Sequence, residues 1–184
     1  MNAPDEFDAD DNFEGSDGDI DFDAELDSPE KLVWQLLLMI NPDDEETALR
    51  QFAAYHDAKA ETGGDDIEPV WILKDVIDWT SGFHVGADDN EALIESINEL
   101  AARWNLRLDW GTDVSDEDFL AGADVPALMA TAYDRLREYG YTLWTWNAGD
   151  DVHAGWITHS RDDEAMQALA PALGIELRPG SDAF

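Results

Sequence analysis

The stretch that most constrains the fold is Tyr141–Ile157, which reads YTLWTWNAGDDVHAGWI. Two alternating runs flank a centre rich in Asn, Gly and Asp, the residue types that favour turns. Side chains alternate between the two faces of a strand, so each run is typical of a β-strand. The stretch therefore predicts a β-hairpin whose turn lies at Ala148–Asp151.

The number of loop residues decides which side chains share a face, because a shift of one residue moves every side chain to the opposite face. A loop of odd length places Trp144, Trp146 and Trp156 on one apolar face. A loop of even length places Trp156 on the face opposite the other two. The odd loop gives the more consistent apolar face, so we expect these three tryptophans to be covered by helices.

The other patterns predict helices in the first half of the chain and strands mainly in the second. Ser28 is a suitable N-cap, and Pro29 fits the first position of a helix that ends before Asn41. Hydrophobic periodicity predicts further helices over 43–60, 69–77, 90–104, 124–140 and 162–174, and strands over 106–110 and 175–178.

Counted from residue 106, the order of these elements is β-α-β-β-α-β, the ferredoxin-like arrangement. The predicted fold class is therefore α+β, with a helical N-terminal half packed on a four-stranded antiparallel, ferredoxin-like sheet. We expect residues 29–184 to form a single α+β domain, mainly helical over 29–104 and sheet-containing over 105–184.

The first thirty residues contain thirteen acidic side chains and no basic one. Like charges repel one another and oppose compaction, so we predict a disordered acidic N-terminal arm over residues 1–28. Within it, Asp19–Leu26 alternates acidic with apolar residues. That segment is either part of a solvated tail or a strand that adds to a sheet edge on a partner or on the body.

The chain as a whole has 44 acidic and 10 basic residues, a formal net charge of −34. This field opposes direct binding to nucleic acid and to anionic membranes. The surplus serves solubility, a salt-rich cell or a basic protein partner. The absence of cysteine removes disulfides and thiolate chemistry. No apolar run is long enough to span a bilayer, so we expect a cytoplasmic protein.

Two motifs resemble metal sites, but each lacks a feature that such a site requires. Gly149-Asp150-Asp151 resembles the magnesium-binding turn of RNA-dependent RNA polymerases, but the chain is too short for a polymerase and its charge repels a template. The Asp-rich runs near the N-terminus lack the glycine that a calcium loop needs at its sixth position. We therefore assign no catalytic, cofactor-binding or metal-binding residue.

The best candidate for a binding surface is the aromatic connector over residues 78–86, together with the hairpin over residues 141–157. Irregular segments that carry aromatic residues and glycine often line binding sites. A structural connector, with Trp79 and Phe83 in the core, is the competing interpretation. The candidate binding residues are Trp79, Phe83, His84, Trp110 and His153.

Three motifs resemble a bacterial domain-of-unknown-function family of acidic proteins. They are Asp-Trp-x-Ser-Gly-Phe at Asp78–Phe83, the helix that leads to Asp109 and Trp110, and Gly-Tyr-x-Leu-Trp-x-Trp at the hairpin. The resemblance covers roughly residues 68–175 and implies a bacterial intracellular protein. It implies no activity, so it transfers no catalytic residue.

These observations favour a non-enzymatic, strongly acidic protein-binding or regulatory module that captures a basic partner, because opposite charge speeds the encounter. The alternative is a small-ligand-binding protein or an enzyme that uses the aromatic connector and the hairpin. One acidic face would indicate a partner, whereas an even spread of charge would indicate solubility.

Overall fold

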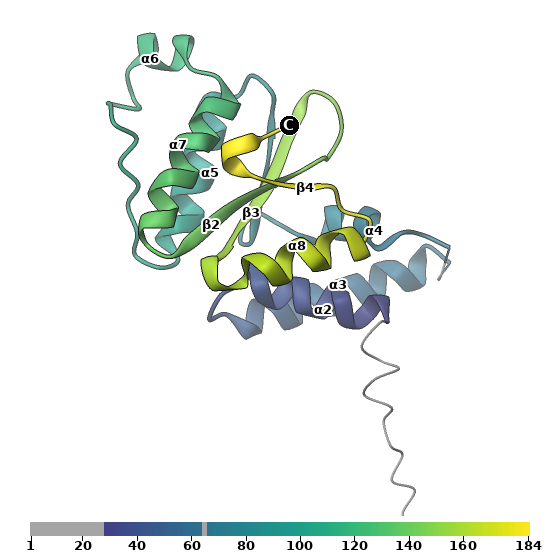
Figure 1. Ribbon diagram of the computed structural model, residues 1–184. Coiled ribbons are helices and arrows are strands. Elements are labelled where there is room, and N and C mark those ends of the chain that lie inside the picture. The colour runs from purple at the N-terminus through teal and green to yellow at the C-terminus, as the bar shows by residue number, and fades with distance from the viewer. Residues whose placement is uncertain (1–27, 64–65) are drawn as a thin grey trace, which may run out of the picture.

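The structure, a computed structural model, describes residues 28–63 and 66–184 (Figure 1). Within these ranges it is α+β, with seven α-helices and one four-stranded antiparallel sheet. The helices are α2 (Pro29–Ile40), α3 (Glu45–Glu61), α4 (Pro69–Val76), α5 (Asn90–Ala102), α6 (Glu117–Gly122), α7 (Val125–Glu138) and α8 (Asp163–Ala172). The strands are β1 (Gly82–Gly86), β2 (Tyr141–Trp146), β3 (Val152–His159) and β4 (Leu177–Pro179), with short 3-10 turns η1 (Ser160–Asp162) and η2 (Gly180–Asp182).

Side-chain caps fix the starts of several helices. The Ser28 side chain accepts a hydrogen bond from the Lys31 N–H, and Pro29 occupies the first turn of α2, as the sequence predicts. Aspartates perform the same task at the starts of other helices, because a short carboxylate satisfies free backbone N–H groups there. The capping aspartates are Asp44 of α3, Asp89 of α5, Asp116 of α6 and Asp124 of α7.

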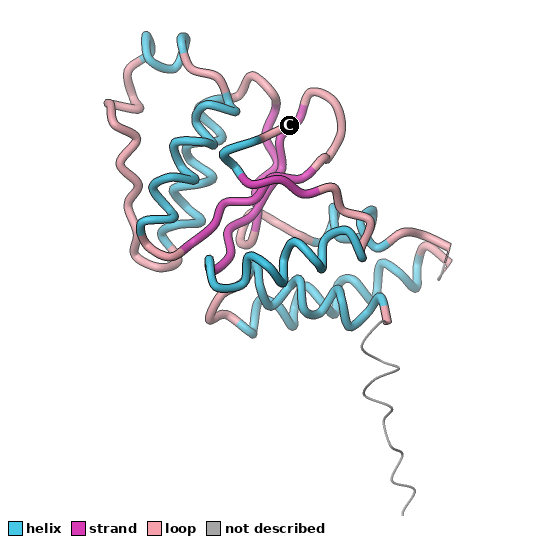
Figure 2. Tube along the Cα trace, in the orientation of Figure 1, coloured by secondary structure: helices cyan, strands magenta, loops and turns pink. Residues whose placement is uncertain are grey.

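The sheet has the strand order β1-β3-β2-β4, and every neighbouring pair is antiparallel. β1 and β4 are therefore its two edges. In Figure 2 the strands cross the middle of the molecule, between two groups of helices.

Each face of the sheet is covered by its own helices (Figure 1). One core, the tryptophan core, contains Trp144 and Trp156 and is formed with side chains from α2, α3, α4 and α8. The other core, the α5–α7 core, contains Leu143 and Ile157 and is formed with side chains from α5 and α7. The alternation of side chains along β2 and β3 thus supplies two apolar faces, as expected for a sheet buried on both sides.

The hairpin has the odd loop that the sequence predicts. Trp144 pairs with Trp156 and Trp146 with Ala154, which leaves five residues between β2 and β3. The three tryptophans therefore share one face, and all are buried. Gly149 and Asp151 have positive φ, so this loop is a turn, as predicted.

The strand predicted over residues 106–110 is wrong. This segment has no strand partner, although it is extended and Trp110 at its end is buried. Apolar and polar residues alternate in this segment because one of its sides packs on the α5–α7 core. The first strand is instead β1, inside the aromatic connector over residues 78–86.

The ferredoxin-like arrangement is not confirmed. Here β4 pairs with β2, at the edge opposite β1, whereas in the ferredoxin-like order the fourth strand pairs with the first. The connection from β3 through α8 to β4 therefore crosses the sheet in the same lateral direction as the connection from β1 to β2. The strands β3 and β4, however, run antiparallel to β1 and β2. Right-handed connections then place α8 on the face opposite α5 and α7, which is where it lies.

The helical N-terminal half does not pack as one unit. Helices α2, α3 and α4 contribute to the tryptophan core, whereas α5 contributes to the opposite core. The predicted arm at 1–28 and its alternating segment Asp19–Leu26 lie outside the described residues, apart from Ser28.

Candidate binding site beside strand β1

A hollow of about 260 Å³ lies beside the edge strand β1. It brings together three of the five candidate residues, Trp79, Phe83 and His84. Trp79 and His84 are exposed, whereas Phe83 is buried and contributes its ring to the α5–α7 core. The remaining lining residues are Ile77, Asp78, Gly82, Ser96 and Glu99.

The hollow lies between the two helical layers. Ile77 packs on the tryptophan core, whereas Ser96 and Glu99 belong to α5, which covers the opposite face. The strand between them is an edge of the sheet. A molecule in this hollow therefore contacts the connector, the strand edge and α5 together.

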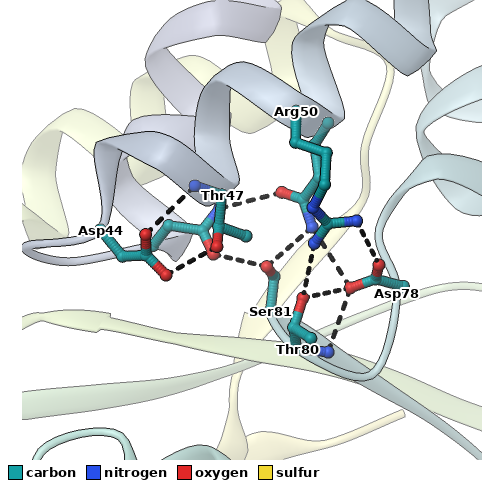
Figure 3. A network of polar contacts seen from close by, with 8 residues as sticks. Asp44, Thr47, Arg50, Asp78, Thr80 and Ser81 are labelled. Carbon is teal, nitrogen blue, oxygen red and sulfur yellow. Dashed lines mark hydrogen bonds and ion pairs between the residues drawn. The ribbon is translucent and has the colours of Figure 1, made fainter.

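The connector is held in place by α3 (Figure 3). Arg50 Nη1 lies 3.0 Å from Asp78 Oδ2, and Arg50 Nη2 donates to Thr80 Oγ1 at 3.2 Å. The backbone N–H of Thr80 also donates to Asp78 Oδ1 at 3.1 Å, and the Thr80 hydroxyl bonds the same oxygen. The residues on both sides of Trp79 are thus held by hydrogen bonds, and the indole between them is 74% exposed.

A buried polar group anchors the end of the connector. The Gln51 amide donates to Ser81 Oγ at 2.7 Å, and Asn41 Nδ2 donates to Gln51 Oε1 at 2.9 Å. All three side chains are buried, so their mutual hydrogen bonds offset the loss of water. This closed group joins the end of α2, the middle of α3 and the start of β1.

The pKa of the Asp78 carboxyl lies below its ordinary value of 3.8. Partial burial is the largest influence and by itself raises this pKa. Hydrogen bonds from Thr80 and Arg50, with the positive charge of Arg50, together outweigh burial. Asp78 therefore stays ionised and holds the turn that carries Trp79.

Helix α5 presents a row of acidic side chains, Glu91, Glu95 and Glu99, spaced four residues apart and all exposed; we call it the acidic row. Residues at this spacing are neighbours on a helix, and like charges there cost a few tenths of a kcal/mol per pair. No basic residue of α5 offsets them.

Helix α5 runs back along β1, and the acidic row lies on its exposed side. The helix starts beside the end of that strand, because the Asp89 N–H donates to the Gly86 carbonyl at 3.0 Å. At the other end of the row, Glu99 shares the hollow with Gly82, the first residue of β1.

The two remaining candidate residues lie elsewhere. Trp110 is buried in the α5–α7 core, and its indole N–H donates to Asn98 Oδ1 at 3.1 Å. His153 pairs with Val85 across the sheet, so it points to the face opposite His84, which pairs with Ala154. Neither lines the hollow.

His153 has an unusual environment for a sheet histidine. Burial lowers the pKa of its imidazole from the ordinary 6.5. Its Nδ1 atom is buried, and no hydrogen-bond partner for it exists among the described residues. The side chain is therefore poised to stay neutral at the pH of most cells.

The hairpin tryptophans do not form an exposed platform. Trp144 and Trp156 are at most 2% exposed, and Trp146 is 8% exposed. Trp146 and Trp156 lie with their ring centroids 6.2 Å apart, inside the tryptophan core. The hairpin thus contributes to folding, and the exposed aromatic contact is Trp79.

Two larger hollows, of about 460 and 550 Å³, flank the start of α2. Both lie at the start of the described chain, beside Ser28 or Pro29. In the described part of the chain, no three acidic or histidine side chains converge as metal ligands. Within the same ranges, no helix has the length and apolar character needed to cross a membrane.

Sequence reasoning missed the α5 side of the hollow. The spacing of Glu91, Glu95 and Glu99 is visible in the sequence once the helix over 90–104 is predicted. This spacing is the signal that could have indicated the α5 side of the hollow. The position of Glu99 beside Gly82 was not readable, because it depends on how α5 folds back along β1.

A family model described as a domain of unknown function (DUF6630) matches residues 32–180, well over half of the chain. The chain belongs to this family. The hollow, the connector and α5 all fall inside the DUF6630 region. The expected membership of a domain-of-unknown-function family is therefore confirmed. No curated protein and no solved structure matches the chain.

Proposed function

We propose that this DUF6630 protein is a non-enzymatic binding module that captures a basic protein partner in the hollow beside β1. The observation that carries the proposal is Trp79, an indole that is 74% exposed on a turn fixed from both sides. An exposed tryptophan gains no stability from burial in the free protein, so its rigid presentation fits a contact made with another molecule.

The chemistry around Trp79 suits a lysine or arginine side chain. A cation placed over the face of an indole gains about 0.5–1 kcal/mol at an exposed site. Glu99 lines the same hollow and adds a carboxylate within the same depression. The acidic row continues this negative surface along α5 beyond the hollow.

The charge of the whole chain supports the same partner. A net charge of −34 raises the rate of encounter with a cationic surface and opposes approach to nucleic acid or anionic membrane. The proposal includes a bacterial origin and a cytoplasmic location, as the family resemblance implies.

The alternative function, a small-ligand site or an enzyme, has less support. The hollow of about 260 Å³ is smaller than the 300–1,000 Å³ typical of small-molecule sites. The hairpin tryptophans on which that alternative depends are buried. The combination of an exposed indole, a strand edge and a carboxylate fits a protein segment better.

Binding of a labelled peptide tests the proposal. The probe is a fluorescein-labelled octapeptide of alternating lysine and valine, measured by anisotropy at near-physiological salt; its analogue with glutamate in place of lysine is the negative control. We expect Trp79→Ala and Glu99→Gln each to weaken binding about two- to fivefold, the size of one exposed cation contact.

Matched substitutions outside the hollow separate a site from general attraction. Trp71 is 61% exposed on α4, and Glu61 is exposed at the end of α3. Trp71→Ala and Glu61→Gln should leave the affinity unchanged. Equal weakening by all four substitutions, or equal binding of the lysine and glutamate peptides, would contradict the proposed function.

A further inference from the structure

The outer side of β1 can be identified from its hydrogen-bond pattern. The Ala87 N–H donates to the Asp151 carbonyl at 2.9 Å, just beyond the paired residues Gly86 and Val152. In an antiparallel ladder, bonded pairs alternate with non-bonded pairs. Phe83 and Val85 therefore direct their backbone groups toward β3, and residues 82, 84 and 86 direct theirs toward the open edge.

Two of the outward groups are used locally. The Gly82 N–H donates to the Asp78 carbonyl, and the Gly86 carbonyl accepts from the Asp89 N–H, both at 3.0 Å. The Gly82 carbonyl, both backbone groups of His84 and the Gly86 N–H have no hydrogen-bond partner among the described residues. These two donors and two acceptors alternate along one line, as the edge of a sheet presents them to a further strand.

The two edges of the sheet differ in their protection. β4 has three residues and ends at Pro179, which has no N–H to offer, and the turn η2 follows it directly. β1 contains no proline and no lysine, the residues with which proteins commonly block an exposed edge. The open edge is thus the one beside the hollow.

We propose that the basic partner binds as an extended segment that adds a fifth strand to β1. This inference rests on the proposed function, because it names how the same site holds its partner. The four unpaired backbone groups bind the main chain of the segment. Alternate side chains of an added strand point to the two faces of the sheet, so one set lies on the face that α5 covers and the other set lies on the face of His84.

Charge selects the occupant of this edge. Glu99 lines the hollow beside β1, so a lysine or arginine of the added strand that enters the hollow lies near a carboxylate. A second copy of this chain carries the same charge of −34 and is repelled. The alternating segment Asp19–Leu26 carries four acidic residues and is disfavoured for the same reason.

Two substitutions at one position separate backbone pairing from side-chain contact. His84→Pro removes an outward N–H and leaves the ladder to β3 intact, a position where sheets tolerate proline. His84→Ala removes the imidazole and keeps the N–H. For the lysine–valine octapeptide we expect His84→Pro to weaken binding at least about tenfold, and to weaken it more than His84→Ala, which keeps both outward backbone groups.

Methylated peptides test the same pairing on the wild-type protein, so the result does not depend on how the proline variant folds. An added strand uses the amides of alternate residues only. We expect N-methylation of one alternate set of peptide amides to weaken binding at least about tenfold, and methylation of the other set to have little effect.

The outcomes separate the two proposals. If the wild-type protein binds the lysine peptide no better than the glutamate peptide, the proposed function fails. Suppose instead that the wild-type protein binds the lysine peptide, that His84→Pro binds it equally well, and that both methylated peptides bind as well as the unmethylated one. Then only strand addition is overturned. A wild-type dimer that becomes monomeric on His84→Pro would assign the edge to a second copy and overturn the basic segment. Tighter peptide binding after deletion of residues 1–27 would show that the chain's own acidic segment competes for the edge, and would overturn the assignment of a free edge.

Discussion

Trp144 lies directly opposite Trp156 in the ladder between β2 and β3, and both side chains are buried. The indole N–H of Trp144 donates to Thr158 Oγ1 at 2.9 Å, so its polar atom is satisfied within the core. Trp146 extends the same face and lies against Trp156. These three tryptophans belong to the core that joins the sheet to the helices α2, α3, α4 and α8.

Removing one of these rings should cost much of the stability of the fold. Trp146→Ala should lower the free energy of unfolding by about 3–5 kcal/mol, because a large buried ring is lost and a cavity remains. The same change at the exposed Trp71 should stay within about 0.5 kcal/mol. Urea denaturation of both variants measures this difference, and equal midpoints for Trp146→Ala and wild type would refute a core role for the hairpin.

Gly155 is required by close packing across the sheet. A Cβ atom at this position would lie 2.7 Å from Phe83 Cζ and would also overlap the Trp144 carbonyl oxygen. Gly155→Ala should therefore destabilise the protein by roughly 3 kcal/mol or more, since the backbone cannot move aside. Gly122 of α6 has nothing near its Cβ position, so Gly122→Ala should be neutral or slightly stabilising. Thermal unfolding that ranks the two variants in the opposite order would contradict this packing.

His153 should make stability fall as the pH decreases below 6.5. Burial lowers the pKa of its imidazole in the folded protein, so between that lowered pKa and 6.5 the unfolded chain binds more protons. Its contribution is therefore complete above pH 6.5 and declines as the pH falls toward the lowered folded pKa. We expect His153→Asn to lose less stability than wild type between about pH 7.5 and pH 5.5 in urea denaturation. Parallel pH profiles for the two proteins would show that this histidine is not the cause.

Asp78 should contribute in the same direction but in a lower pH range. Its folded pKa lies below 3.8, so its stabilising effect is present above pH 3.8 and is lost as the pH falls through the folded value. Asp78→Asn should cost about 1 kcal/mol near neutral pH, because the ion pair with Arg50 is partly exposed. The stability difference between variant and wild type should shrink in acid. A constant difference down to the lowest pH measured would contradict an ionic role.

The hairpin could be predicted because its information is local. The alternation of tryptophans with small and polar residues, and the odd turn that keeps them on one face, are both readable from Tyr141–Ile157. The helix starts were also readable, since Ser28 and Pro29 specify an N-terminus without any distant contact. These features depend on the backbone within a few residues.

The strand order and the site could not be predicted because they depend on distant contacts. β1 is short and begins and ends with glycine, so its propensity is weak and its pairing with β3 alone defines it as a strand. The segment at 106–110 has the stronger local pattern but no partner. The same limit applies to the site: Trp79 was expected as a candidate, but its approach to Glu99 requires the return of α5 along β1.

The most direct test of the central claim is amide hydrogen exchange at individual residues of β1, with and without the lysine–valine octapeptide. In the free protein the His84 and Gly86 N–H groups face the open edge and should exchange faster than the N–H groups of Phe83 and Val85, which face β3. We predict that the peptide slows exchange at His84 and Gly86. Peptide binding that leaves both amides unchanged, while exchange slows elsewhere, would contradict capture of a basic segment at the edge of β1.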